Sequence, residues 1–330
     1  MSVEPLLEAM LAADSVQREC SELAAWLPFW LDQQAAHEQN GPFVAAVTAA
    51  ARADRLAWAF FCGYQGAIQA AFPGQVRLGR ASAFCVNESG RKLTELATAL
   101  HSRDDGLWLQ GAKSWTLAGV DDLQLFVLTR AATGPAQGPG SLVCVHLPLR
   151  TAGVTLSARR PQGPVPELPH AEVRFDDVAI GPAQIVAGDG YADHAKPFRL
   201  REDIFVTACT LAYLFGEGRA AAWPALWSQK CLAALCGLDV CATLDPGRLD
   251  THVLAAGVLA AAGEVIDDTE FLWARGAAEK LRRWQRDRPL LSLGKEARRQ
   301  RARKAWQARG WPVPESDAMG GHISGAMDFL

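Results

Sequence analysis

The hydrophobic periodicity changes twice along this chain, and these changes constrain the fold more than any other feature of the sequence. In the first 75 residues apolar side chains recur at helical spacing, as in the stripe that takes every fourth residue from Leu56 to Phe72. From about residue 76 to 187 the pattern becomes short β-type runs with glycine- and proline-rich breaks between them. Helical spacing returns from Pro197 onward. A β module therefore lies between two helical blocks.

Six runs in the middle region have the composition of strands. They are Ser82–Val86, Leu107–Gln110, Leu123–Thr129, Leu142–Leu147, Val154–Ser157 and Ala171–Phe175. Since no helical pattern separates them, they favour an antiparallel sandwich or barrel over a doubly wound sheet. No Gly-x-Gly-x-x-Gly motif follows any of the six runs, which disfavours a Rossmann nucleotide site.

The last third of the chain predicts four long helices, at about 198–217, 220–242, 247–276 and 277–308, which together suggest an up-down bundle. The predicted fold is therefore of the α+β class, in four parts. These are an N-terminal helical domain over 1–75, a central antiparallel β-barrel or sandwich domain over 76–192, a C-terminal four-helix bundle over 193–309, and an irregular tail over 310–330.

Composition limits the class of protein. The 330 residues are 49% hydrophobic and 21% charged with a net charge of −3, which is ordinary for a soluble globular protein and gives no reason to expect nucleic-acid binding. We find no apolar, charge-free stretch long enough for a membrane span and no secretory signal in the first residues, so we expect a cytoplasmic protein. The eight cysteines lack Cys-x-x-Cys or zinc-like spacing, so we expect buried thiols and no metal site.

The segment Gly111–Thr116 has the most distinctive local composition. It predicts a hairpin or sharp bend that carries Trp115 and a hydroxyl between strands. An aromatic plane beside a hydroxyl on rigid strands could hold a flat cofactor with a polar edge. The alternative is an amphipathic aromatic residue that packs at the end of a strand.

The order of the three folded parts resembles that of the acyl-CoA dehydrogenase family, and several segments resemble family motifs at matching points. Phe84–Gly90 stands where the family has a strand that runs into a Thr-Glu-Pro-Gly loop over the flavin, and Gly111–Thr116 resembles its Gly-x-Lys-x-Trp-x-Thr segment. Further similar segments are Val173–Val178 (Val-x-Phe-Asp-x-Val in the family), the glycine turn Gly188–Tyr191, and Arg286-Asp287 followed by Leu293-Gly294. Together they cover roughly residues 55–305.

This resemblance implies an FAD-dependent oxidoreductase that desaturates an acyl-CoA thioester at its α,β-bond, with FAD between the β domain and the bundle. The residues that match the flavin-binding segments are Val86, Glu88, Ser89, Trp115 and Thr116. Thr116 is included because Leu117 occupies the position of the family's usual threonine. The resemblance also implies a homodimer or homotetramer, and an electron acceptor such as an electron-transfer flavoprotein.

The resemblance offers two positions for the catalytic base. In many members it lies eight residues after the Arg-Asp aspartate, where this chain has Lys295. A second branch places it at the start of the first bundle helix, and Glu202 matches that position. The alternatives are Glu296, no competent base at all, or Glu202 as an acidic residue that the helix dipole favours in a first turn. Asp203 is expected to be a solvated first-turn charge.

Two family segments that bind the FAD pyrophosphate and adenine, Arg-x-x-Phe-Gly and Gln-x-x-Gly-Gly, have no clear counterpart. Arg219 and Arg248 could neutralise phosphate, or could be solvated surface charges. A second hypothesis is therefore a degenerate relative that binds flavin or acyl-CoA, or pairs with another subunit, without turnover. A third is the same fold acting on a substrate that is not a thioester, or using reduced flavin with oxygen.

Overall fold

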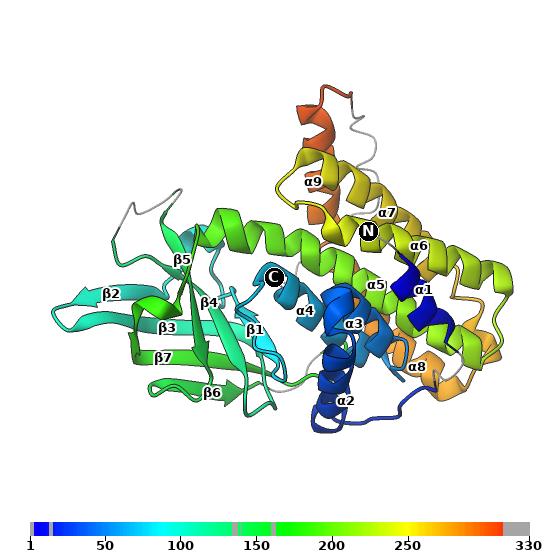
Figure 1. Cartoon of the computed structure of the whole chain (residues 1–330), viewed down its shortest axis with the longest axis horizontal. Helices are drawn as coiled ribbons and strands as arrows, with labels where there is room; N and C mark the ends of the chain where they lie inside the picture. The colour runs from blue at the N-terminus through cyan, green and yellow to red at the C-terminus, as the bar shows by residue number, and fades with distance from the viewer. Residues whose placement is uncertain (1–2, 13–15, 134–137, 139, 160–162, 313–330) are drawn as a thin grey trace.

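The computed structural model describes residues 3–12, 16–133, 138, 140–159 and 163–312, so most of the predicted tail lies outside the described residues. Helices stand at both ends of the described chain and strands in the middle (Figure 1). The helices are α1 (Glu4–Leu11), α2 (Leu23–Ala36), α3 (Gly41–Ala50), α4 (Leu56–Ala71), α5 (Lys196–Ala220), α6 (Ala225–Thr243), α7 (Leu249–Asp267), α8 (Ala278–Asp287) and α9 (Lys295–Ala308). The strands are β1 (Ser82–Cys85), β2 (Ala99–Arg103), β3 (Gly106–Leu117), β4 (Gln124–Arg130), β5 (Leu142–Pro148), β6 (Val154–Ala158), β7 (His170–Ile180) and β8 (Ile185–Val186).

The strands form one sheet in the order β6-β7-β3-β2-β4-β5-β8, and β1 also pairs with β4. Most pairs are antiparallel, as predicted, but β1 and β2 each run parallel to β4. Across the described residues the end strands β6 and β8 each pair with a single neighbour, so these pairings leave the sheet open. The expectation of a purely antiparallel domain is wrong because the alternation of apolar residues carries no information about strand direction.

The helix predicted over 277–308 is two helices, α8 and α9, and α7 ends at Asp267 rather than near residue 276. Pro289, which has no N–H to donate, starts the short 3-10 turn after α8. Gly294 then has φ of 73°, a left-handed conformation that leads into α9. The turn between these two residues lets α9 change direction and pack on α7.

Glycines on α4 and α5 bring these two helices into backbone contact. A Cβ at Gly63 would lie 2.7 Å from Cα of Val206, and one at Gly66 would lie 2.7 Å from the Phe205 ring. A Cβ at Gly216 of α5 would collide with the carbonyl oxygen of Ala51, so α5 also lies against the end of α3. Because α4 precedes β1 and α5 follows β8 in the chain, the contact between α4 and α5 holds the two ends of the β domain next to each other, with the sheet to one side of the helix pair (Figure 1).

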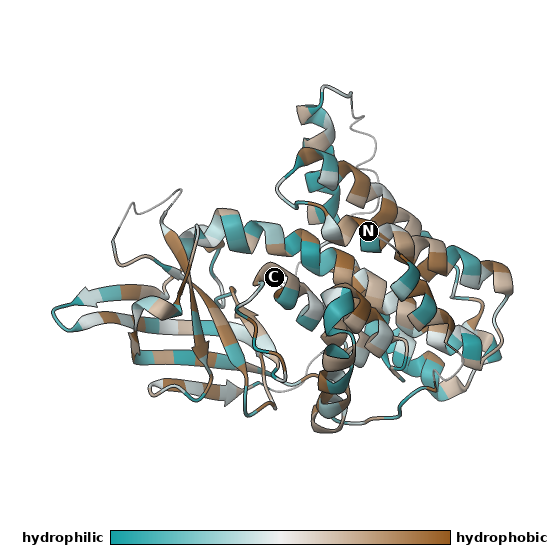
Figure 2. Ribbon diagram, in the orientation of Figure 1, coloured by the Kyte–Doolittle hydropathy of each residue, from teal (hydrophilic) through white to brown (hydrophobic). Residues whose placement is uncertain are grey.

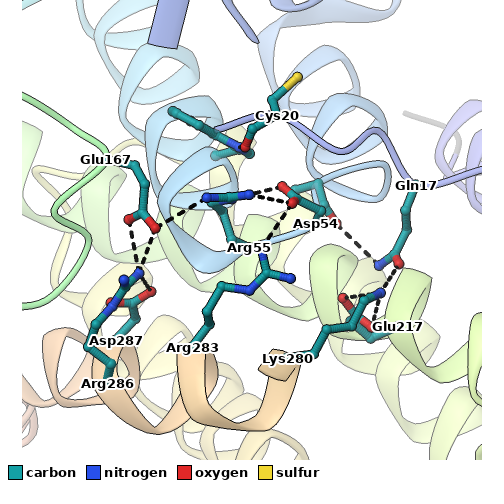
Figure 3. A network of polar contacts seen from close by, with 12 residues as sticks. Gln17, Cys20, Asp54, Arg55, Glu167, Glu217, Lys280, Arg283, Arg286 and Asp287 are labelled. Carbon is teal, nitrogen blue, oxygen red and sulfur yellow. Dashed lines mark hydrogen bonds and ion pairs between the residues drawn. The ribbon is translucent and has the colours of Figure 1, made fainter. Parts of the chain in front are cut away.

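A network of mostly buried charges joins the N-terminal helices, the loop before β7 and α8 (Figure 3). Asp54 pairs with Arg55 at 2.7 Å and with Arg283 of α8 at 3.2 Å. Glu167, in the loop before β7, pairs with Arg55 at 3.3 Å and with Arg286 at 2.8 Å. Three parts of the chain that are distant in sequence are therefore held by the same set of ion pairs.

The same network extends along α8 in both directions (Figure 3). Lys280 donates to Glu217 of α5 at 2.9 Å and also hydrogen-bonds Gln17. Asp287 is fully buried and accepts a hydrogen bond from the backbone N–H of Val165 at 2.8 Å. The Arg286-Asp287 pair that resembled a family motif is thus a contact between α8 and the β domain.

Among the described residues one helix, α7, is long and apolar enough to cross a membrane by length and composition alone, which corrects the expectation that no segment would pass this test. It packs against α5, α6 and α9 as a bundle helix, yet only 22% of its most apolar stretch is buried. The hydropathy colouring shows strand β5 largely brown, whereas the charged helices α8 and α9 carry much teal (Figure 2). The exposed side of α7 therefore stands out as an apolar helix face outside the core.

Candidate functional site

Gly111–Thr116 lies inside β3 and does not form a hairpin, which corrects the prediction for this segment. The register against β7 shifts twice, between residues 109 and 111 and between residues 113 and 116. At the first shift Gly111 has φ of 134°, and a Cβ there would lie 2.6 Å from Cα of Thr98. At the second shift Trp115 has φ of 61°, a left-handed conformation that is strained for an aromatic residue. The strand is bulged at both places, and such bulges re-aim side chains.

The loop that follows β1 lies directly against this bulged strand. The backbone N–H of Ser114 donates to the carbonyl oxygen of Asn87 at 2.8 Å. The hydroxyls of Ser89 and Ser114 hydrogen-bond each other at 2.8 Å. Two residues further along the strand, the hydroxyl of Thr116 lies 3.5 Å from the sulfur of Cys85. The two segments that resembled flavin-binding motifs are therefore in contact.

Glu88 anchors this loop. Its carboxylate accepts hydrogen bonds from the N–H groups of Ala97 (2.7 Å) and Thr98 (3.0 Å) and pairs with the fully buried Lys113 at 2.9 Å. Burial alone would raise the pKa of Glu88, but Lys113 and the backbone donors outweigh burial, and the pKa is lowered. Lys113 also donates to the carbonyl of Val86 at 3.2 Å. Glu88 and Lys113 thus fix the loop and cancel each other's charge.

Trp115 is half-buried on the same bulge. The guanidinium of Arg159, at the end of β6, lies 4.3 Å from the centroid of its ring. His170 meets the ring at a centroid distance of 6.0 Å and an angle of 70°. Since a left-handed non-glycine residue costs about 1–3 kcal/mol and such residues cluster at functional sites, the conformation of Trp115 supports a role for its ring beyond packing.

Glu202 lies on α5, but not in the first turn. A π-helical turn over Gly190–Ala195 precedes α5, which makes Glu202 the seventh residue of the α-helix proper. The helix dipole acts mainly within the first turn, so it does not account for an acid here. Burial, together with the neighbouring Asp203, raises the pKa of Glu202 to about 7.

Asp203 is not the solvated charge that we expected. Its carboxylate pairs with Arg298 at 2.9 Å and with Arg301, both on α9. Its side chain is 15% exposed. The expectation was wrong because α9 packs over this turn of α5 and supplies both arginines. The local sequence around residue 203 contains no sign of where α9 lies.

Tyr64 of α4 connects Glu202 to the loop region. The N–H of Phe84 on β1 donates to the Tyr64 hydroxyl at 2.9 Å, and that hydroxyl donates to the Phe84 carbonyl at 3.4 Å. Phe198 of α5 packs edge-on against both rings. Burial, then the proximity of Cys85 and Glu202, raise the pKa of Tyr64. Glu202 and the start of the flavin-like loop therefore lie on two sides of one aromatic cluster.

Sequence reasoning missed Tyr64, Phe198 and Lys113. In the sequence Tyr64 is one residue of the apolar stripe from Leu56 to Phe72. The pattern does not show that its hydroxyl meets the backbone of β1. For Lys113 a signal existed. A cation in the middle of a strand, at a position facing inward by alternation, is rare unless it is paired. That signal pointed to a buried partner such as Glu88.

The other residues considered from sequence have contacts elsewhere. Glu296 is exposed on α9 and accepts a hydrogen bond from Gln300 at 3.1 Å. Arg219 donates to the carbonyl oxygens of Met10 and Ala12, and Arg248 pairs with Asp250 at 3.2 Å. Arg219 therefore ties down the end of α1, and neither arginine faces the loop after β1.

The region around residues 86–89 and 114–116 fits the edge and face of a flavin ring. It offers the aromatic plane of Trp115 and the hydroxyls of Ser89 and Ser114. Since one hydroxyl proton is used in the bond between these two serines, the other can be donated to a ligand. The charges of Glu88 and Lys113 are paired with each other, and a further cation, Arg159, lies over the Trp115 ring. In the described part of the chain, no group of three or more His, Cys, Asp or Glu side chains could hold a metal ion.

Comparison with known proteins gives likenesses in structure only. No protein-family model matches the chain, and no curated protein matches its sequence. FMN-bound TdsC from Paenibacillus sp. A11-2 is 16% identical, with a TM-score of 0.64 over 83% of this chain and 85% of that one. Butyryl-CoA dehydrogenase from Megasphaera elsdenii is 15% identical, with a TM-score of 0.60 over 80% and 82%. PigA with FAD and proline is 11% identical, with a TM-score of 0.63 over 93% and 97%.

These structural similarities extend over most of each chain, but the sequence identities are low. They therefore show the fold alone. The resemblance inferred from the sequence is thereby confirmed at the level of the fold: the chain has the fold of the acyl-CoA dehydrogenase-like flavoproteins.

Proposed function

We propose that this protein is a flavin-dependent oxidoreductase, with FAD held between the β domain and α5. The main observation in support of this proposal is the bulged strand, where Trp115 is held in a left-handed conformation beside the Ser89–Ser114 hydroxyl pair. Such strain persists only where the surrounding structure imposes it. TdsC binds FMN and PigA binds FAD in structures of this fold, which supports a flavin at the corresponding place here.

The proposed reaction is the α,β-dehydrogenation of an acyl-CoA thioester in the cytoplasm, with Glu202 as the base. Removing a weakly acidic α-proton requires a carboxylate that is shielded from water and has a raised pKa. Glu202 is half-buried, and burial together with Asp203 raises its pKa to about 7, which suits it to this role. The bound flavin would supply the hydride acceptor, and an electron-transfer flavoprotein is the proposed onward acceptor.

The second candidate is a non-catalytic relative that binds flavin or acyl-CoA as a partner subunit. Two observations favour it. Lys295 replaces a carboxylate at the first base position and is exposed on α9. Arg219, the nearest match to an FAD-binding arginine, is engaged with the end of α1. In this case a bound flavin would persist without being reduced by any thioester.

Anaerobic mixing of the flavin-loaded protein with a panel of acyl-CoA thioesters separates the two candidates. We expect loss of the oxidised-flavin absorbance with at least one thioester. Glu202→Gln should keep the flavin and abolish this bleaching, whereas Glu296→Gln, a matched change on exposed α9, should leave it intact. A protein that takes up no flavin would refute the oxidoreductase, and bleaching by the Glu202→Gln variant would refute Glu202 as the base.

We further propose that the exposed face of α6 and α7 forms the contact of a homodimer, which could pair again into a tetramer. A groove of about 650 Å³ between these helices is lined by small and apolar residues, with Lys230 at one rim and Glu264 and Asp268 at the other. Lys230 and Asp268 pair with each other at 3.2 Å, so the small and apolar floor of the groove is the surface that we assign to a second copy about a two-fold axis. Ala261→Arg, in the exposed floor of the groove, should convert the dimer to a monomer in sedimentation velocity. A wild-type protein that is monomeric at all concentrations would contradict this assignment.

A further inference from the structure

We propose that Arg199 of α5 and Arg301 of α9 form a binding site for the phosphate group of the flavin nucleotide. This inference rests on the proposed function. To the proposed flavin site it adds the side chains that bind the phosphate, for which the sequence contains no clear motif.

Arg199 makes no direct bond from its guanidinium to the two carboxyl groups near it, those of Glu202 and Asp203. It lies one helical turn before Glu202 and Asp203 on α5 and is half-buried. Within the described residues it makes no hydrogen bond and no ion pair, so its guanidinium keeps all five N–H donors. A half-buried guanidinium without an acceptor is unfavourable, because its donors lose water without gaining a partner.

Arg301 faces the same place from α9. One of its amino groups bonds Asp203, and the remaining donors have no partner among the described residues. Burial, followed by repulsion from Arg199 and Arg298, lowers its pKa against the attraction of Asp203. The two unsatisfied guanidiniums therefore lie within electrostatic reach of each other.

Arg298 shows what a purely structural arginine looks like in the same cluster. It donates to Asp203 at 2.9 Å and to the carbonyl oxygens of Leu293 and Leu291 at 3.1 and 3.0 Å. Its donors tie the 3-10 turn before α9 to α5. Three of the five N–H groups of Arg298 are used in this way, whereas Arg301 has a hydrogen bond from one amino group and Arg199 has none among the described residues.

The local charge balance calls for an anion. Three guanidiniums, those of Arg199, Arg298 and Arg301, lie within electrostatic range of the carboxylate of Asp203, and Arg199 and Arg301 also lie within range of Glu202. Guanidinium forks match the oxygens of a phosphate in a bidentate manner. The other arginines considered for phosphate, Arg219 and Arg248, are bonded elsewhere.

The position of the pair favours the flavin over coenzyme A as the source of the phosphate. Arg199 lies one turn from Glu202, which in the proposed reaction stands at the reacting carbon. The flavin phosphate is separated from its ring only by the ribityl chain. The phosphates of coenzyme A lie beyond the whole pantetheine arm, farther from the thioester.

Flavin titrations of the apoprotein test this inference without measuring turnover. Quenching of flavin fluorescence gives dissociation constants for riboflavin, FMN and FAD. We expect FMN and FAD to bind at least about tenfold more tightly than riboflavin, and inorganic phosphate to compete with FMN. Arg199→Gln and Arg301→Gln should remove this advantage and leave riboflavin binding unchanged. Arg199→Gln is the cleaner variant, because it breaks no bond in the described structure.

Arg303→Gln, an exposed cation on α9 outside the cluster, is the matched control and should bind FMN like the wild type. Equal binding of riboflavin and FMN would overturn the phosphate site while leaving the flavin assignment intact. A loss on Arg199→Gln of coenzyme A binding relative to pantetheine, with FMN unaffected, would overturn the flavin as its ligand. Failure of riboflavin, FMN and FAD alike to bind would instead refute the proposed function.

Discussion

At the scale of single residues, Glu202 links the pH of the solution to the proposed chemistry. Its carboxyl must be ionised to accept a proton, and its pKa lies at about 7. The rate of flavin bleaching by a thioester should therefore rise as pH increases through about 7 and then level off. Stopped-flow measurements across this range test the point. A rate that is independent of pH in this range would mean that another group accepts the proton.

The same residue gives a stability prediction with a definite sign. The folded-state pKa of about 7 lies above the ordinary value of 4.5, so the folded state binds the proton more tightly than the unfolded chain does. Stability then falls as pH rises from about 4.5 to about 7. Relative to wild type, Glu202→Gln should be more stable by about 1–3 kcal/mol above pH 7, with little difference below pH 4.5. Urea unfolding at pH 4 and pH 8 would measure this, and an equal effect at both values would contradict it.

At the scale of elements, the close approach of α4 and α5 depends on the absence of side chains. A methyl group at Gly63 would meet the backbone of Val206, which cannot move without shifting α5. We expect Gly63→Ala to destabilise the fold by about 1–3 kcal/mol. Gly257→Ala on α7 is the control, because no atom lies within 4 Å of a Cβ there. That change should stabilise α7 by about 0.5–1 kcal/mol. Thermal unfolding of both variants checks the pair, and a neutral Gly63→Ala would show that α4 and α5 can separate.

The order of helices and strands could be predicted because each long element repeats its own period. β2 and β8 were not predicted, since β2 has an exposed polar half and β8 has only two residues. The break between α8 and α9 was missed although Pro289 and Gly294 signalled it, because the charged pattern on both sides is helical. The direction of β1 and the left-handed φ of Trp115 are set by tertiary contacts that no local pattern contains.

For the candidate site, the resemblance located segments but not their contacts. It pointed to Glu88 and Ser89 as flavin contacts, whereas the structure shows that the Glu88 carboxylate is occupied by Lys113 and two N–H groups. Asp203 finds its partners about 95 residues later, on α9. Arg199 could not be singled out from sequence, because an arginine with no partner looks the same in a sequence as a paired one.

At the scale of the whole molecule, the ion-pair network holds the parts together. Asp54, 2% exposed, faces both Arg55 and Arg283. Removing its charge with Asp54→Asn takes away the carboxylate that Arg283 pairs with and leaves Arg55 with Glu167 alone, and we expect a loss of about 3–5 kcal/mol. Asp122→Asn, which breaks a half-exposed pair with Arg80 at 3.0 Å, should cost at most about 1 kcal/mol. Denaturant unfolding compares the two, and similar losses would argue against a special role for the buried network.

The place of α8 in this network also bears on how the chain is synthesised. The strands pair only with one another, so all of their partners have left the ribosome soon after residue 186. The helices of the N-terminal part need Arg283 and Lys280, which appear about a hundred residues later. Chains generally fold as they emerge, domain by domain. The middle of this protein should therefore be folded first, while the ion pairs of the N-terminal part are completed only when α8 is made.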